Sequence, residues 1–257
     1  MTLRVEGAEQ LKPYPGLASF TADDAEYFFG REAEIETLWK KLRRPHLLGL
    51  IGPSGAGKSS FLRAGVLPAM PQTWSSVVCH PGDAPMLSVG RALAPAFAGD
   101  TEAIRDMIRF EDPEVALGMF RRWRERHEEV LLVVDQFEEL FTLNAPESQA
   151  RFAELLGRLA IDADVHVLLS IRDDFLMECH RHEALRPLIS DLMLLDPPVG
   201  ANLRRALVQP ATRCGYRFED DALIEEMLAE VEGERGALPL LAFAAAQLWE
   251  RRDRNEG

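Results

Sequence analysis

The segment GPSGAGKS at residues 52–59 restricts the possible folds of this chain more tightly than any other part of the sequence. It matches the pattern G-x-x-x-x-G-K-[S/T], and it lies between an apolar run at residues 47–51 and a stretch that predicts a helix from Lys58 to about Ala64. Its glycines let backbone N–H groups turn inward around a phosphate, and the helix N-terminus adds positive potential. The sequence therefore predicts a phosphate-binding loop after a buried parallel strand.

Individual residues of this loop have separate expected roles. The Lys58 ammonium is expected to reach the β- and γ-phosphates of a nucleotide, the Ser59 hydroxyl to coordinate Mg²⁺, and Ser60 to touch the α-phosphate. Lysine usage supports a special role for Lys58, because the chain has 25 arginines and four lysines, and Lys58 is the only lysine after Lys41. A compact ammonium fits where a planar guanidinium does not. The rest of the expected cradle consists of Gly52, Pro53, Ser54, Gly55, Ala56 and Gly57.

A second candidate site follows the strongest strand signal, residues 130–134 (VLLVV), where Asp135 comes next in the chain. A carboxylate at the carboxyl end of a buried strand lies on the ligand-binding edge of an open α/β sheet, where it can hold Mg²⁺. Glu138 and Glu139 follow closely, and either one could polarise an attacking water. The alternative interpretation is an acidic helix start that complements the helix dipole.

Arg172 directly follows another apolar strand, residues 165–171. If that strand neighbours the strand before the glycine-rich loop, the guanidinium points toward a γ-phosphate, where it can stabilise charge or report the presence of the phosphate. The alternative is an ion pair with Asp173, Asp174 or another acid.

The alternation of strands and helices predicts an α/β fold. Two further strands are expected at residues 75–79 and 192–195, so that five strands form a parallel sheet with helices on both faces. The intervening helices are expected at residues 33–42, 85–97, 101–108, 113–127 and 147–159.

The pattern changes after residue 197, where helices are expected at residues 201–207, 220–230 and 240–249 and no strand signal occurs. This change predicts a small all-helical subdomain. The expected organisation is an N-terminal arm with entry helices, a nucleotide-binding core and this helical subdomain, at residues 1–44, 45–197 and 198–257.

Composition excludes several classes of function. Asp and Glu outnumber Lys and Arg by 42 to 29, and the resulting net charge of −13 disfavours direct binding to nucleic acid or to an anionic membrane. No apolar stretch reaches the roughly 18 residues of a membrane span, and no signal-peptide core is present. Cys79, Cys179 and Cys214 are far apart and lack metal-ligand spacing, so reduced thiols and a cytoplasmic location are expected.

Together with other segments, these motifs resemble the STAND class of P-loop NTPases, and in particular its bacterial novel STAND type. The resemblance covers nearly the whole chain from Pro13 to Arg251 and depends on matches in family order. The matching segments are residues 13–17 (PYPGL), 28–32 (FFGRE), 52–59 (GPSGAGKS), 135–141 (DQFEELF), 236–241 (GALPLL) and 248–250 (LWE).

The resemblance implies a P-loop core of the ASCE/AAA+-like type, followed by a helical lid, with ATP or ADP and Mg²⁺ as cofactors. It implies that Phe29, Gly30 and Arg31 lie against the adenine. It also implies that Pro239, in the lid motif, touches the base, although the Gly–Pro spacing here is looser than the family motif.

For the core, the resemblance implies that Asp135 acts with Glu138 and Glu139 in hydrolysis and that Arg172 is the first sensor. It further implies that the Arg172 strand lies between the strand of the glycine-rich loop and the strand of Asp135. The family normally continues into a winged-helix domain and then a sensor or effector region, so this chain is expected to be truncated before them.

The leading functional hypothesis is a slowly hydrolysing ATP switch of a bacterial signalling protein, in which the ATP or ADP state controls the lid and self-assembly. An AAA+-like loader or remodelling ATPase would use the same phosphate motifs. A small-molecule kinase with a basic lid is a third hypothesis, and a nucleotide-binding scaffold without turnover is a fourth. The candidate basic lid residues are Arg204, Arg205, Arg213 and Arg217.

Overall fold

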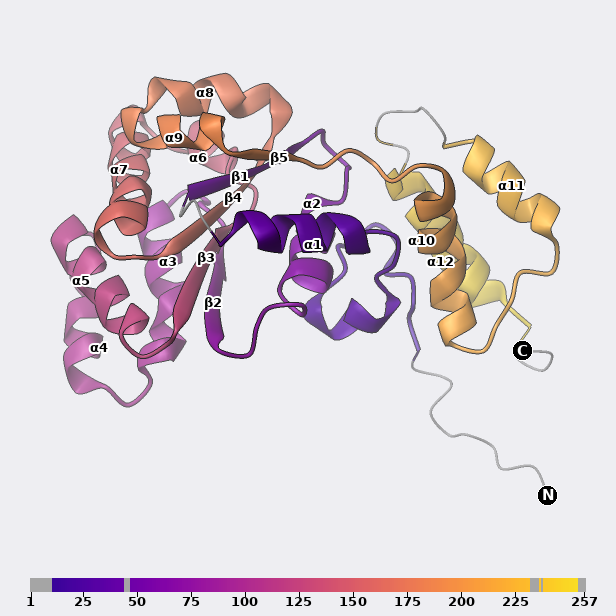
Figure 1. The fold of residues 1–257 in the computed structure, drawn as a ribbon, viewed down its shortest axis with the longest axis horizontal. Helices are drawn as coiled ribbons and strands as arrows, with labels where there is room; N and C mark the ends of the chain where they lie inside the picture. The colour runs from indigo at the N-terminus through magenta and orange to yellow at the C-terminus, as the bar shows by residue number, and fades with distance from the viewer. Residues whose placement is uncertain (1–10, 44–46, 232–235, 237, 254–257) are drawn as a thin grey trace. The chain divides into compact units, whose positions relative to one another are not determined.

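The computed structural model describes residues 11–43, 47–231, 236 and 238–253 (Figure 1). Spatial contacts divide the chain into two compact units. Unit 1 contains Met1–Ile35, Ser54–Pro68 and Asp196–Gly257, and unit 2 contains Glu36–Pro53 and Ala69–Leu195. The two units follow spatial contacts and not chain order, so the sequence-based division at residues 44 and 197 stays a prediction.

Unit 2 is built on a five-stranded parallel sheet with the order β2-β3-β4-β1-β5. The five predicted strands are all present, within one residue of the predicted bounds at each end. β4 lies between β1 and β3, which confirms the order implied by the family resemblance. The strands are β1 (Leu47–Gly52), β2 (Trp74–Cys79), β3 (Glu129–Val134), β4 (His166–Arg172) and β5 (Leu192–Leu194).

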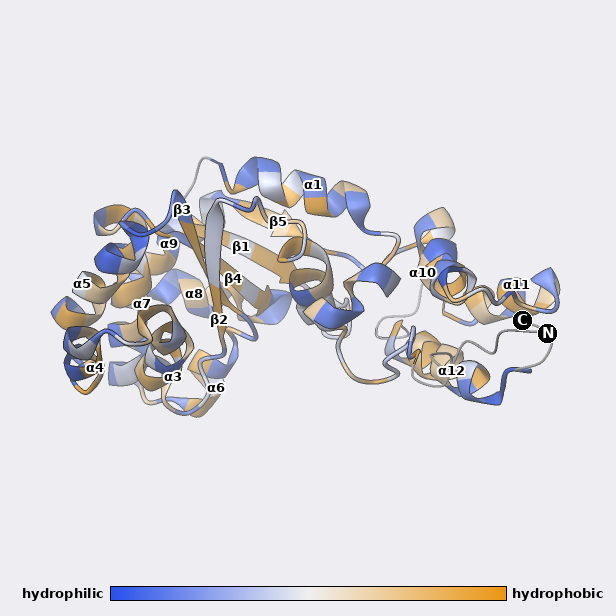
Figure 2. Ribbon diagram, turned by 90° about the horizontal axis from the view of Figure 1, so that it is seen from below, coloured by the Kyte–Doolittle hydropathy of each residue, from blue (hydrophilic) through white to orange (hydrophobic). Residues whose placement is uncertain are grey.

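The central strands are apolar along most of their length because both faces of the sheet are covered. Every residue of β1 is buried, and Figure 2 shows β1 and β4 in the hydrophobic colour. Leu47 and Ile51 point into the main core cluster, together with residues of α3, α5 and α7. Leu48 and Leu50 alternate with them on the other face and are also buried.

The helices of the sheet unit include the predicted ones and several short ones that were not predicted. The predicted helix at residues 85–97 ends early and continues as a 3-10 turn, because Pro95 has no N–H to donate to an α-helical bond. The elements are α1 (Glu32–Lys41, which begins in unit 1), α3 (Pro85–Leu93), η3 (Ala94–Phe97), α4 (Thr101–Met107), α5 (Pro113–Arg124), α6 (Glu139–Leu143), α7 (Pro146–Asp162), η4 (Asp173–Phe175), α8 (Leu176–Arg181), η5 (Glu183–Leu185) and α9 (Arg186–Ser190).

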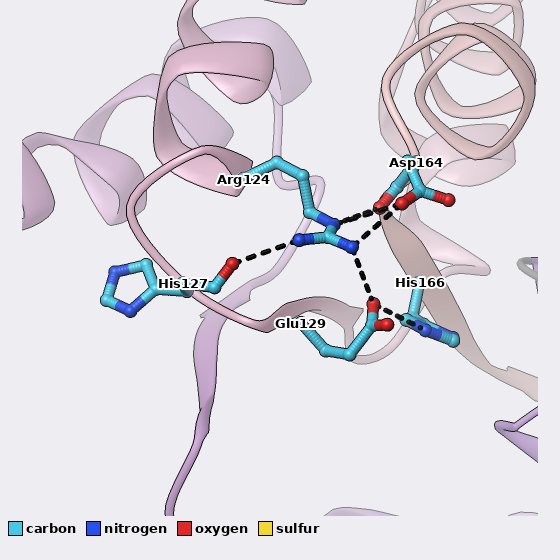
Figure 3. Close-up of polar contacts among 5 residues, drawn as sticks. All are labelled: Arg124, His127, Glu129, Asp164 and His166. Carbon is cyan, nitrogen blue, oxygen red and sulfur yellow. Dashed lines mark hydrogen bonds and ion pairs between the residues drawn. The ribbon is translucent and has the colours of Figure 1, made fainter.

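A charged cluster fastens the end of α5 to the amino ends of β3 and β4 (Figure 3). Asp135 and Arg172 lie at the opposite, carboxyl ends of these two strands. The guanidinium of Arg124 donates to Asp164 Oδ2 at 2.9 Å and to the His127 carbonyl at 2.9 Å, and it lies 3.4 Å from Glu129 Oε2. The His166 ring, itself buried, lies 3.3 Å from the same Glu129 oxygen. The cluster positions the strand starts and lies away from the predicted site.

Unit 1 contains the three predicted C-terminal helices, and residues 196–231, 236 and 238–253 form no strand. Its core cluster joins residues of these helices to Tyr14 of the N-terminal arm. The predicted helix after Lys58 is a single α-helical turn that continues as a π-helix, a variant often found near functional sites. The elements are η1 (Ala22–Tyr27), α2 (Lys58–Ser60), η2 (Phe61–Val66), α10 (Gly200–Arg213), α11 (Asp221–Ala229) and α12 (Leu238–Arg251).

The N-terminal arm is attached to α10 through the hydroxyl of Tyr14. The Tyr14 hydroxyl donates to the Leu207 carbonyl and accepts from the Ala211 amide at 3.2 Å, two backbone groups one helical turn apart. These bonds lie next to Pro210, which cannot donate a helical bond. Burial raises the pKa of the Tyr14 phenol above its usual value, so the hydroxyl keeps the proton it donates.

Replacing Tyr14 by phenylalanine is expected to destabilise unit 1 by about 1–2 kcal/mol, because two buried groups of α10 lose their partner while the ring remains. Hydrogen exchange of residues 200–213 should become faster than in the unmutated protein. Thr212→Ala is the matched control, since its hydroxyl donates to Val208 on an exposed face of the same helix. Unchanged exchange in Tyr14→Phe would contradict the expected role of the hydroxyl.

The described part of the chain has two further properties that bear on function. None of its helices is both long and apolar enough to cross a membrane. Cys79, Cys179 and Cys214 are all free thiols, as the sequence predicts. Burial raises the pKa of Cys79 and of Cys179 to about 12, so both remain protonated at neutral pH.

Candidate nucleotide site

The carboxyl ends of β1, β3 and β4 bring several predicted site residues to one edge of the sheet. Gly52, the first residue of the glycine-rich loop, is the register partner of Arg172. Val134 pairs with Leu169, so Asp135 follows at the same edge. Ligands of open α/β sheets bind outside this edge.

The turn after β3 holds Asp135 in a buried position. Asp135 is 1% exposed, and its Oδ1 accepts a hydrogen bond from the Gln136 amide at 3.0 Å. The Asp135 amide donates to the Cys79 carbonyl at 2.9 Å, and Gln136 has a left-handed φ of 53°. The carboxylate is an oxygen donor of the kind that Mg²⁺ prefers, so its chemistry fits the predicted metal role.

The two acids after Asp135 occupy different environments, although the sequence could not separate them. Glu139 Oε2 accepts from the Gly82 amide at 3.1 Å, and Asn144 donates to the Gly82 carbonyl at 2.7 Å. Glu139 therefore helps to hold the loop that follows β2. Glu138 precedes α6, and its carbonyl accepts from the Phe141 amide. Neither contact was predicted, and no short-range sequence pattern pairs Gly82 with an acid 57 positions later.

Arg172 forms an ion pair with Asp174. Such a pair was the alternative interpretation of Arg172 in the sequence analysis. Its Nε donates to Asp174 Oδ1 at 3.0 Å and its Nη2 donates to Oδ2 at 2.6 Å. The guanidinium carbon also lies 5.5 Å from the centre of the Phe175 ring. The sensor role remains a prediction beside this observed pair.

In unit 1, the glycine-rich loop has the backbone that its glycines allow. Gly55 and Gly57 have φ values of 79° and 86°, which side-chain-bearing residues rarely adopt. The Phe61 amide donates to the Gly57 carbonyl at 2.8 Å, so the helix starts directly at Lys58, which is buried. The Ser60 hydroxyl accepts from the Phe20 amide at 3.1 Å, and this bond ties the arm to the loop.

The lid motif lies against the same loop within unit 1. A Cβ added at Gly55 would lie 3.4 Å from Pro239 Cγ and 3.4 Å from Gly236 Cα, and one at Gly57 would lie 3.5 Å from a methyl group of Leu238. The structure therefore brings Pro239 next to the loop despite the loose Gly–Pro spacing. Ala237 lies outside the described residues.

The Phe29-Gly30-Arg31 segment contacts both the loop and α10 in unit 1. A Cβ at Gly30 would lie 2.3 Å from the Asn202 carbonyl oxygen, so only glycine fits here. The buried Arg31 donates from Nη2 to the Ala56 carbonyl at 3.2 Å and from Nη1 to Glu34 at 3.0 Å. Arg31 thus holds the glycine-rich loop, a role that the sequence did not predict.

A parallel sheet with the order β2-β3-β4-β1-β5, followed at β1 by a glycine-rich loop that leads into a helix, defines the class of P-loop NTPases. The chain belongs to the Novel STAND NTPase 1 family, whose model matches residues 13–256. It is therefore a P-loop NTPase of the STAND class, as the sequence motifs predicted. No curated protein sequence matches the chain.

Solved structures support the same fold at low sequence identity. A Walker-type ATPase of Pyrococcus abyssi matches with a TM-score of 0.68 and 16% identity, over 91% of this chain and 71% of that one. The ORC2 protein of Aeropyrum pernix, solved in ADPNP-ADP complexes, matches with a TM-score of 0.54 and 15% identity, over 86% of this chain and 61% of that one. The chain thus spans less than two thirds of ORC2.

Proposed function

We propose that this chain is the nucleotide switch of a bacterial STAND signalling protein in the cytoplasm, which binds ATP and hydrolyses it slowly. The observation that carries the proposal is the shared sheet edge at which Gly52 and Arg172 are register partners and Asp135 follows β3. ATP is the proposed nucleotide because the similar ORC2 structure is described as holding ADPNP and ADP.

In the proposed mechanism, the Lys58 ammonium binds the β- and γ-phosphates, and the loop amides bind around them. Ser59 and Asp135 provide oxygen donors that fit Mg²⁺, which when bound would neutralise phosphate charge. Glu138 or Glu139 orients the attacking water. The engagement of Glu139 with Gly82 favours Glu138 for that role.

The contacts inside unit 1 support a link between nucleotide and lid. Pro239 lies beside Gly55, and Arg31 holds the Ala56 carbonyl. A phosphate bound by the loop therefore acts on a segment that is packed against the lid motif. We propose that the γ-phosphate shifts the lid and exposes a surface for assembly with further copies.

The nucleotide carried by the purified protein tests this proposal. Denaturing the protein and separating the released nucleotide by chromatography is expected to yield stoichiometric ADP, because a switch rests in a long-lived state. An apo protein that turns over ATP rapidly would contradict the switch and favour a loader or remodelling ATPase. Transfer of the γ-phosphate to an added small molecule would favour a kinase.

The ion pairs of the C-terminal arginines weaken the kinase alternative. Arg204 pairs with Asp221 and Glu225, Arg205 pairs with Glu32, and Arg213 lies 3.5 Å from Glu26. A kinase lid would have to exchange these carboxylate partners for the transferred phosphate, which lowers the phosphate affinity at each of the three arginines.

A further inference from the structure

The guanidinium of Arg172 is held by its own neighbours in the chain. Two parallel bonds join it to the Asp174 carboxylate, and its carbon lies over the Phe175 ring, 5.5 Å from the ring centre. Such a bidentate pair uses the planar fork of arginine, which binds a carboxylate and a phosphate with the same geometry. A carboxylate in this position therefore occupies the donors that a phosphate would need.

The Arg172–Asp174 pair lies beside the start of the glycine-rich loop. Arg172 is the register partner of Gly52, where the glycine-rich loop begins. Its side chain is therefore attached to the strand next to the one that leads into this loop. Asp174 is two residues further along, in the turn that follows β4. The pair can break and re-form through side-chain rotation because it is local in the chain.

We propose that Asp174 determines the preference between nucleoside di- and triphosphates by competing with the terminal phosphate for Arg172. This inference rests on the proposed function, in which Arg172 senses that phosphate. With a diphosphate bound, Arg172 stays on Asp174. With a triphosphate bound, the guanidinium must leave Asp174 first, so Asp174 weakens triphosphate binding and raises the threshold of the switch.

The exposure of the pair sets the size of the effect. The side chains of Arg172 and Asp174 are 39% and 53% exposed, so water replaces part of the hydrogen bonding that each side chain loses when the pair breaks. Half-exposed pairs of this kind change an equilibrium by about two- to five-fold. An effect of this size biases a switch without locking it.

The same turn also contacts α6, the helix that begins at Glu139. Phe175 stacks on Phe141 of α6, with ring centroids 6.3 Å apart and an interplanar angle of 12°. Phe141 is two residues after Glu139. When Arg172 leaves Asp174, the bond that is lost belongs to a turn that packs against α6.

The test compares Asp174→Asn with Asp173→Asn, which removes the same charge one residue earlier. Dissociation constants are measured by titration for ADP and for a non-hydrolysable ATP analogue, with Mg²⁺ present. Asp174→Asn is expected to bind the analogue about two- to five-fold more tightly while ADP affinity is unchanged. Asp173→Asn is expected to leave the ratio of the two affinities unchanged, and Asp174→Glu to retain the unmutated ratio.

Arg172→Ala, alone and combined with Asp174→Asn, separates this inference from the proposed function. If Arg172→Ala lowers the affinity for the analogue but Asp174→Asn leaves the ratio unchanged, Arg172 is a sensor and the competition is refuted. If Arg172→Ala leaves the ratio unchanged, both the sensor role and the competition are refuted. The competition would also be refuted if Asp174→Asn raised the affinity for the analogue equally in the presence and absence of the Arg172 side chain. The effect would then come from the negative charge of Asp174 acting on the phosphates directly.

Discussion

Replacing Lys58 by alanine is expected to abolish tight nucleotide binding, with a loss of about 100-fold or more in affinity for both ADP and ATP. Lys58 is a buried residue at the end of the glycine-rich loop, and a charged hydrogen-bond donor to phosphate contributes about 1.5–3 kcal/mol before its electrostatic attraction is added. Titration with a fluorescent nucleotide measures the change.

Lys40→Ala is the matched control for this experiment. Lys40 is exposed and pairs with Glu36 on α1, so removing it changes the net charge by the same amount without affecting the loop. Its nucleotide affinity should equal that of the unmutated protein. Unchanged affinity in Lys58→Ala would refute the assignment of the site to this loop.

Replacing both Glu138 and Glu139 by glutamine is expected to leave ATP binding intact and to reduce hydrolysis by about 100-fold or more, because a positioned base contributes about 10²–10⁴ to the rate. Single-turnover measurement of phosphate release gives the rate, and titration gives the affinity. Glu147→Gln, on the exposed first turn of α7, is the control for loss of one charge.

The single variants separate the two acids. Glu138→Gln is expected to account for most of the loss. Glu139→Gln keeps an oxygen that accepts from the Gly82 amide, so its effect should be small. Retained hydrolysis in the double variant would show that another group orients the water, and a large loss confined to Glu139→Gln would reverse the proposed roles.

The strands and the glycine-rich loop could be predicted because their signals are local. Each central strand is a short apolar run, since both sides of it are buried, and the loop has glycines where positive φ values are needed. Short helices escaped prediction because five or six residues do not complete the two turns that reveal a helical period. This applies to α6, α8 and α9.

The candidate site was predicted in its residue types and only partly in its contacts. The acids at 138 and 139 look equivalent in the sequence, and the contact that the Gly82 amide, from another loop, makes with Glu139 is not visible there. Arg172 had two interpretations, and its observed partner is Asp174. Gly30 has a left-handed φ of 85°, and a Cβ there would also meet the Asn202 carbonyl, 172 positions away, which the sequence does not reveal.

The sequence by itself determined the class of this protein, because phosphate binding by a glycine-rich loop depends on residues adjacent in the chain and on the strand and helix that flank them. It also determined the number of strands through their apolar runs. The family resemblance implied only that β4 lies between β1 and β3, and the tertiary structure decided the full order β2-β3-β4-β1-β5 and the register that pairs Gly52 with Arg172. Strand order depends on packing between segments far apart in the chain, and no local pattern of residues records that packing.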